Sequence, residues 1–222
     1  MKKLLCLLLA LMCVMACVSC NLGGGSSEDE EEAKEATVET IAGIINASNP
    51  TQIATKVDYV EEGEDHITSS YNTEKDEVNG IYKFTFSSAR KASVEELLPT
   101  DVKVLEGTVW YNADGTVTSS TGDEWSKEDA VGYLPEMINI NKSSFKSYEL
   151  VNDGDDLVGV IAANDAKRVF GEDIAASSDI SVEIDTNGTY LYKITVTYTT
   201  NQGATVTITT SYDYAVIDLK TA

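Results

Sequence analysis

Residues 190–214 read YLYKITVTYTTNQGATVTITTSYDY and contain the pattern that decides the fold. Aromatic or branched side chains alternate with Thr or Ser on both sides of the turn sequence NQG at 201–203. Because successive side chains of a strand point to opposite faces, this period of two predicts two half-buried strands joined by a hairpin. The apolar faces of these strands are expected to hold Tyr192, Ile194, Val196 and Tyr198, and Val206, Ile208, Tyr212 and Tyr214.

The same signals recur upstream of this hairpin. Residues 53–59 and 82–86 alternate in the same way, and turn sequences stand at 112–115 (NADG), 152–154 (NDG) and 187–188 (NG). Short turns between consecutive strands favour antiparallel pairing, so the sequence predicts a long antiparallel meander. Strands and helices do not alternate regularly, which argues against a doubly wound nucleotide-binding fold.

Three helices are expected beside the strands. Residues 36–46 place apolar side chains at helical spacing on one face. A second helix is predicted over 126–138, with a kink or break at Pro135. A short third helix is predicted over 164–170, before a glycine that can end it. Helices and an antiparallel sheet in separate segments define the α+β class.

The first 19 residues have the composition of a signal peptide. Two lysines precede the apolar run 4–18, which is too short and too abruptly ended for a membrane-spanning helix. All four cysteines lie within the first twenty residues, so the remaining chain offers no disulfide or thiolate chemistry. The end of the run resembles the lipobox of bacterial lipoproteins, whose cysteine carries diacylglycerol. Both Cys17 and Cys20 fit this role, and the sequence leaves the choice open.

Charge and composition divide the rest of the chain into two parts. Residues 20–35 combine Gly and Ser with a block of acids and are expected to form a flexible tether, whereas 36–222 form a single domain. The whole chain has 37 acidic and 16 basic side chains, a net charge of −21. Phosphate contacts need clustered Lys and Arg, so a nucleic-acid partner is excluded. We expect a monomer held to the extracytoplasmic side of the cell membrane by its lipid.

The order of elements resembles a known group of lipoproteins. The strand GTVWYN (107–112), the following GDEW (122–125) and the stretch VEIDTNGTYLYKI (182–194) are similar to LolA-like and LppX/LprG-like lipoproteins. This resemblance implies a curved antiparallel sheet that forms a half-open barrel, with helices covering its concave face and an apolar cavity between them. Those families bind or move lipids or lipoproteins and are not enzymes.

The chain shows no catalytic or metal-binding motif. His66 is the only histidine, which excludes multi-histidine metal centres and predicts a surface position in a polar strand. The acids Asp153, Asp155 and Asp156 do not have the spacing of a calcium loop and are expected in a solvated turn. Pairs of carboxylates for glycoside hydrolysis stay open, because acidic residues are abundant. We expect no enzyme, no cofactor and no metal.

Apolar side chains from the strands and the second helix are the candidate ligand site. They could pack as a solid core or line a pocket, and the resemblance favours the pocket. The expected function is to bind or carry a lipid or another apolar molecule. The alternative is a surface interaction module that docks a protein or a glycan without an internal cavity. The candidate lining residues are Phe84, Phe86, Leu134, Met137, Ile138, Ile194 and Val196.

Overall fold

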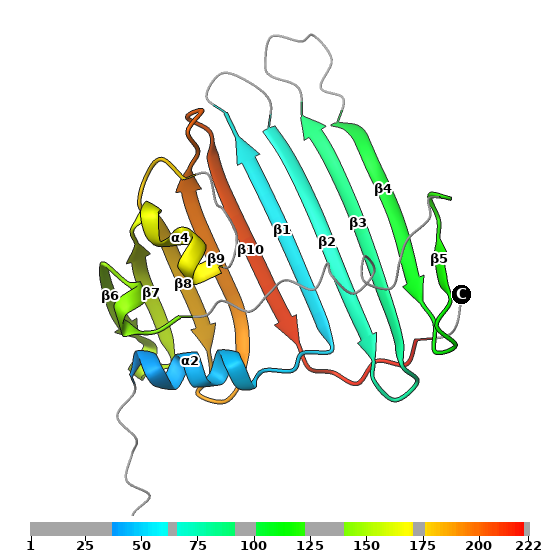
Figure 1. Cartoon of the computed structure of the whole chain (residues 1–222), viewed down its shortest axis with the longest axis horizontal. Helices are drawn as coiled ribbons and strands as arrows, with labels where there is room; N and C mark the ends of the chain where they lie inside the picture. Colours follow the sequence, from blue (N-terminus) through cyan, green and yellow to red (C-terminus); the bar gives the residue numbers. More distant parts are fainter. Residues whose placement is uncertain (1–36, 62–65, 92–100, 123–139, 171–175, 220–222) are drawn as a thin grey trace, which may run out of the picture. The chain divides into compact units, whose positions relative to one another are not determined.

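The computed structural model describes residues 37–61, 66–91, 101–122, 140–170 and 176–219. They form one ten-stranded antiparallel sheet with the strand order β5-β4-β3-β2-β1-β10-β9-β8-β7-β6 (Figure 1). The strands are β1 (Gln52–Val60), β2 (His66–Asp76), β3 (Ile81–Lys91), β4 (Asp101–Tyr111), β5 (Val117–Ser119), β6 (Ser147–Val151), β7 (Asp156–Ile161), β8 (Ile180–Thr186), β9 (Leu191–Thr199) and β10 (Thr205–Asp213).

The sheet consists of two five-stranded meanders joined in the middle. Strands β1 to β5 are neighbours in chain order, as are β6 to β10. The first and last strands of the domain then pair with each other, from Gln52 opposite Asp213 to Val60 opposite Thr205. Strands β5 and β6 stand at the two ends of this order, so the sheet is open. The predicted antiparallel meander is confirmed.

Each predicted hairpin turn lies between two consecutive strands. Gly115, Gly188 and Gly203 adopt positive φ in these turns, and Asn152 and Asp153 do so in the NDG turn. A fifth turn sequence of the same kind, which is not among the predicted turns, is Asn79-Gly80. That pair closes the turn between β2 and β3, where Gly80 has a φ of +67°.

Two described helices pack on the sheet. Helix α2 (Val38–Ala47) begins at Thr37, whose side chain accepts a hydrogen bond from the backbone N–H of Thr40, and it confirms the helix predicted over 36–46. The short helix α4 (Ala166–Phe170) follows a 3₁₀ turn at Ala163–Asp165 and corresponds to the predicted third helix. The helix predicted over 126–138 lies outside the described residues.

The two faces of the sheet differ in chemistry. The face that we call the apolar face contains Val57, Ile208, Val196 and Val182, which stand opposite one another across β1, β10, β9 and β8. It continues on β7 with Leu157, which stands opposite Ile184, two residues from Val182. Both α2 and α4 contribute buried side chains to this face, over β7–β10 (Figure 1). In the described part of the chain, no helix lies on the opposite face.

One predicted face assignment is wrong. Tyr192 was expected beside Ile194 on the apolar face, but Tyr192 is 46% exposed and Leu191 is buried instead. The pairing register shifts between Asp185 and Thr186, so that β9 carries one extra residue here. Such a bulge moves the alternation by one position, which explains why the period-two pattern failed at the end of this strand.

The buried apolar residues form two separate clusters. The larger one lies between α2, α4 and strands β7–β10 and includes Ile41, Ile45, Leu157, Ile161 and Ile184. The smaller one consists of Phe84, Phe86 and Val109 on β3 and β4. Among the described helices, none is long and apolar enough to cross a membrane.

Hydrogen bonds connect the segment around Leu219 to the turn between β2 and β3. Asp76 is 1% exposed and accepts hydrogen bonds from the backbone N–H and the side-chain amide of Asn79, at 2.9 and 2.7 Å. The backbone N–H of Leu219 donates to the same carboxylate at 2.9 Å. These hydrogen bonds, above all those from Asn79, outweigh the effect of burial and lower the pKa of Asp76. The Asp76 carboxylate is therefore buried and charged, and its hydrogen bonds hold residue Leu219 against the turn between β2 and β3.

Candidate functional site

The face opposite the apolar face is rich in hydroxyl groups, and we call it the hydroxyl face. In the centre of the sheet, threonines stand opposite one another in register, as for Thr195 with Thr209 and Thr197 with Thr207. The hydroxyls of Thr197 and Thr207 are 3.3 Å apart. Its Ser and Thr residues on β2, β3, β4, β8, β9 and β10 include Thr68, Ser70, Thr85, Ser87, Thr108, Ser181, Thr195, Thr197, Thr199, Thr205, Thr207, Thr209 and Ser211.

A hollow of about 430 Å³ lies across β10, β1, β2 and β3. Nine of its twelve lining residues belong to the hydroxyl face by their register, so we place the hollow on that face. Its volume falls within the range of small-molecule sites. The nine are Ala54, Lys56, Asp58, Ser70, Asn72, Thr85, Ser87, Thr209 and Ser211, and the other three are Thr55, Tyr71 and Phe86.

Small side chains create the depth of this hollow. Ala54 of β1 stands opposite Ser211 of β10 and Asn72 of β2, and Ser70 of β2 stands opposite Ser87 of β3. Longer side chains follow on the same face toward both ends of the strands. Within the described part of the chain, no hydrogen bond engages the hydroxyls of Ser70, Ser87 or Ser211. These hydroxyls can each donate and accept a hydrogen bond.

One ion pair borders the hollow. Lys56 Nζ lies 2.7 Å from Asp58 Oδ2, and the hydroxyl of Thr68 donates to Asp58 Oδ1 at 2.8 Å. The Nε2 atom of His66 lies 3.4 Å from the same oxygen. Partial burial acts to raise the pKa of Asp58, but the hydrogen bonds from Lys56 and Thr68 and the charge of Lys56 outweigh it and lower the pKa. Asp58 therefore stays ionised at neutral pH.

An aromatic side chain lies on the same face beside the hollow. Trp110 of β4 stands opposite Lys83 of β3, and Thr108 stands opposite Thr85, which lines the hollow. Trp110 is thus the diagonal neighbour of Thr85, a spacing that long side chains can bridge. Lys83 Nζ lies 5.4 Å from the centre of the Trp110 ring and also 2.7 Å from Glu74.

The structure places the predicted lining residues in two groups. Phe84 and Phe86 on β3 have ring centres 5.6 Å apart, and Ile194 and Val196 on β9 belong to the other cluster. Strands β3 and β9 are four positions apart in the sheet, which corresponds to about 19 Å. The two pairs therefore do not meet. Leu134, Met137, Ile138, Cys17 and Cys20 lie outside the described residues.

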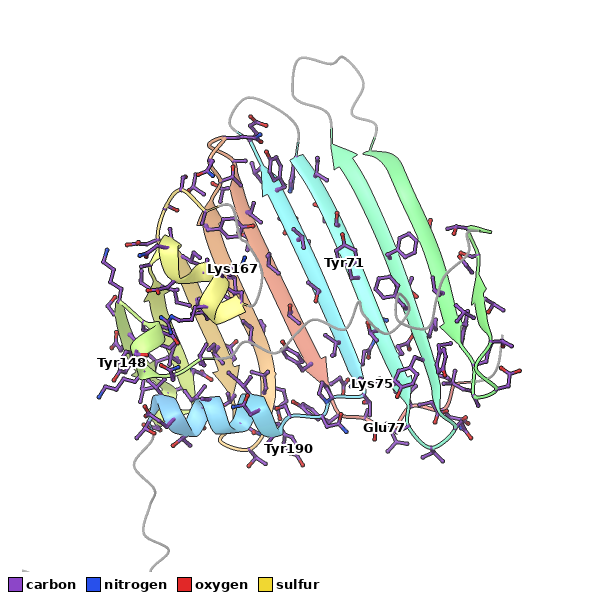
Figure 2. All side chains as sticks on the ribbon, viewed as in Figure 1. Tyr71, Lys75, Glu77, Tyr148, Lys167 and Tyr190 are labelled. Carbon is purple, nitrogen blue, oxygen red and sulfur yellow. The ribbon has the colours of Figure 1, made fainter. Side chains whose placement is uncertain are left out.

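A half-buried lysine lies on the apolar face beside the smaller cluster. Lys75 shares β2 with Tyr71 and stands opposite Tyr82 (Figure 2). Tyr71 in turn lies 6.3 Å from Phe84, ring centre to ring centre. Burial lowers the pKa of Lys75, and the charge of Glu77 offsets this effect in part. No ion pair or side-chain hydrogen bond of Lys75 is formed with the described residues.

The described residues hold no group of three or more metal-binding side chains. Asp156 of the NDG hairpin instead accepts a hydrogen bond from the backbone N–H of Thr186 at 2.8 Å. His66 begins β2 with a side chain that is 41% exposed, which confirms its predicted surface position. A comparison with models of protein families finds no matching family, and a search of curated proteins finds no match.

The hydroxyl face is not among the sites predicted from the sequence. The signal was present in residues 195–211, where Thr or Ser occupies the positions that alternate with the apolar ones. Polar residues at these positions are also typical of the solvent side of any half-buried strand, so they do not by themselves indicate a site. The hollow itself depends on four strands being neighbours, one of which, β10, lies about 150 residues from β1 along the chain.

Proposed function

We propose that this chain is a lipid-anchored, extracytoplasmic binding protein that docks a polar partner on its hydroxyl face. One observation carries the proposal: a hollow of about 430 Å³, whose lining includes the hydroxyls of five Ser and Thr residues of the hydroxyl face, lies on a sheet face over which none of the described helices packs. The opposite face explains the stability of the sheet, since it holds the buried clusters. Among the described residues, neither buried apolar cluster lies on the hydroxyl face, so its shape is available for binding.

The polar groups of the hollow favour binding over catalysis. A carboxyl group can act as a general acid at neutral pH only if its pKa is raised, whereas the pKa of Asp58 is lowered. Asp58 is also engaged by Lys56 and Thr68, which hold it in one position. We therefore propose a non-enzymatic module that needs no cofactor.

The N-terminal segment fits a role at the cell surface. Lipidation at Cys17 or Cys20 would fix the chain to the membrane, and residues 20–35 would act as a tether with strong negative charge. Like charges extend such a segment and repel an anionic membrane surface. The domain of a monomer would then face outward, with its hydroxyl face accessible to partners.

A matched pair of variants tests this proposal. Ser70→Tyr places a ring in the hollow, and Ser181→Tyr places the same ring elsewhere on the hydroxyl face, both at exposed strand positions that tolerate Tyr. Immobilised full-length protein is exposed to the polysaccharide, protein and lipid fractions of the surface of its source cells. A water-soluble fraction should bind the wild type and Ser181→Tyr equally, and Ser70→Tyr at least tenfold more weakly. Equal binding to both variants would overturn the proposal.

A second candidate function is the binding of an apolar molecule with an anionic head on the apolar face. The half-buried ammonium of Lys75 beside Tyr82 and the Phe84 cluster favours it, because no carboxylate of the described residues forms an ion pair with this ammonium and the charge of Glu77 offsets its burial only in part. Helices over the concave face of a curved sheet, as the resemblance implies, would then enclose the ligand. This function ranks second because Phe84 and Phe86 are only 2% and 7% exposed, so the ligand would have to open this side of the sheet.

Native mass spectrometry of the full-length protein with added palmitate tests the second candidate. Lys75→Gln should lower the retained palmitate several-fold, whereas Lys56→Gln, which removes an exposed lysine on the opposite face, should leave it unchanged. Absence of retained palmitate in the wild type, or equal retention by the Lys75→Gln variant, would refute this function.

A further inference from the structure

The hydroxyl face also indicates which class of ligand it suits, provided that the proposed function is right. Beside the charged side chains of Lys56 and Asp58, the hydroxyls of Ser70, Thr85, Ser87, Thr209 and Ser211 line the hollow. The amide of Asn72 joins them, and its oxygen accepts a hydrogen bond from Gln52 at 3.1 Å. Hydroxyl groups both donate and accept hydrogen bonds, as do the hydroxyls of a sugar, so either partner can take either role.

The backbone under the hollow offers no edge for a peptide. Strand β1 is paired on both sides, to β2 and β10, over all nine residues Gln52–Val60. Strand β2 is likewise paired on both sides, to β1 and β3. A peptide that adds a strand needs unpaired N–H and C=O groups at a sheet edge. The ligand must therefore be recognised by side chains alone.

The charges in the hollow balance each other. Lys56 and Asp58 are its two charged residues, and they form an ion pair at 2.7 Å. This neutrality is notable in a chain with a net charge of −21. An anionic or cationic ligand would have to compete with the ion pair, whereas a neutral polar ligand complements the hollow as it stands.

The footprint of the hollow is small. From β10 to β3 it spans three strand spacings, about 14 Å, and from Ala54 to Asp58 it spans about 13 Å along β1. The product is about 180 Å², less than a quarter of the roughly 800 Å² that each partner buries in a stable protein interface. Stable protein interfaces also centre on buried aromatic or Arg side chains, which are absent from the hydroxyl-face residues of this hollow.

Trp110 can make an apolar contact with a sugar ring, which hydroxyl groups cannot make. The apolar side of a sugar ring carries C–H groups, and these pack on the electron-rich face of an aromatic ring. Trp110 is the diagonal neighbour of Thr85 at the border of the hollow. The charge of Lys83 above its ring is held by Glu74, at 2.7 Å from Lys83 Nζ. A chain of two or three sugars would reach from this ring to Ser70.

From these observations we infer that the hollow binds a neutral oligosaccharide. Its hydroxyls exchange hydrogen bonds with Ser70, Asn72 and Ser87, and one of its rings packs against Trp110. The ion pair of Lys56 and Asp58 stands at the end of the hollow and offers one charged donor and one charged acceptor to the same ligand.

An array of neutral and anionic oligosaccharides tests this inference with the full-length protein. At least one neutral oligosaccharide should bind the wild type and Ser181→Tyr with a Kd below about 1 mM, and Ser70→Tyr should weaken it at least tenfold. Trp110→Thr should weaken binding between about twofold and tenfold, the size of one aromatic contact, and Trp110→Phe should restore most of it. Thermal unfolding of each variant checks that the fold is intact.

The outcomes separate the inference from the proposed function. If a protein fraction binds in a manner that Ser70→Tyr abolishes, and no neutral oligosaccharide binds, the sugar inference is wrong and the docking function stands. Preference for anionic oligosaccharides, or sugar binding that Ser70→Tyr leaves unchanged, also overturns the inference. If no fraction and no oligosaccharide responds to Ser70→Tyr, both proposals fail.

Discussion

Replacing Gly159 by Ala should destabilise the fold through one contact. Gly159 lies in β7, opposite Tyr148 of β6, and the ring of Phe145 covers it on the apolar face. A Cβ atom built on Gly159 would lie 2.4 Å from Cδ1 and 2.6 Å from Cε1 of Phe145, and 3.2 Å from Cδ2 of Leu157. Ordinary contacts begin near 3.4 Å, so the ring must move by about 1 Å. Forcing extra volume into packed surroundings costs about 1–3 kcal/mol.

Phe145 has little freedom to make this movement. It directly follows a 3₁₀ turn at Lys142–Ser144, which is closed by reciprocal hydrogen bonds between Asn141 and Ser144. The backbone N–H of Lys146, the next residue, donates to Val160 at 2.7 Å. The ring is thus held from both sides, and we expect the cost of Gly159→Ala to lie in the upper half of that range.

Urea unfolding of the full-length protein measures the effect, with two comparisons. In a Phe145→Ala background the clash is gone, so Gly159→Ala should become neutral or slightly stabilising, and the double-mutant cycle should give a coupling of about 1–3 kcal/mol. Gly43→Ala, in α2 with no atom within 4 Å of its added Cβ, should stabilise by about 0.5–1 kcal/mol. An equal effect of Gly159→Ala in both backgrounds would refute the reasoning.

Three further predictions concern stability. Leu157→Ala should cost about 2–5 kcal/mol, because this side chain is fully buried, whereas Val158→Ala, at 42% exposure, should cost less than about 0.5 kcal/mol; chemical unfolding compares them. Thr37→Ala should cost about 1 kcal/mol by removing the helix cap, measured in the same way. Hydrogen bonds from Asn79 lower the folded-state pKa of Asp76, so its contribution is present above the unfolded pKa of about 4 and is lost as pH falls through the folded pKa. The Tm difference between wild type and Asp76→Asn should therefore shrink below about pH 4, and a constant difference down to pH 2 would contradict this account.

Local signals in the sequence predicted the local parts of this fold. The turn at 201–203 and the helix over 36–46 depend on residues that are close together in the chain, and both are confirmed. Tyr192 was misplaced because a bulge depends on the pairing of two strands rather than on one strand. The joining of β1 to β10 could not be derived, since period-two patterns show that a segment is a strand but not which strand it pairs with.

The candidate site was harder to predict for the same reason. Phe84 and Ile194 have the same pattern in the sequence, yet they fall in different clusters because β2, β1 and β10 lie between their strands. The hollow arises where Ala54, Ser70 and Ser211 become neighbours across three strands. Small side chains at single positions carry no signal of their own, so the depth that they create appears only in the assembled sheet.

The pairing of β1 with β10 determines when the centre of the sheet can form during synthesis. Until β10 leaves the ribosome, β1 has one unpaired edge, and β9 has another. Contacts across about 150 residues are slow to form, and unpaired edges attract other chains. The centre of the sheet therefore stays incomplete until β10 has been made. A chain that ends before Thr205 would expose both central edges and should aggregate rather than fold.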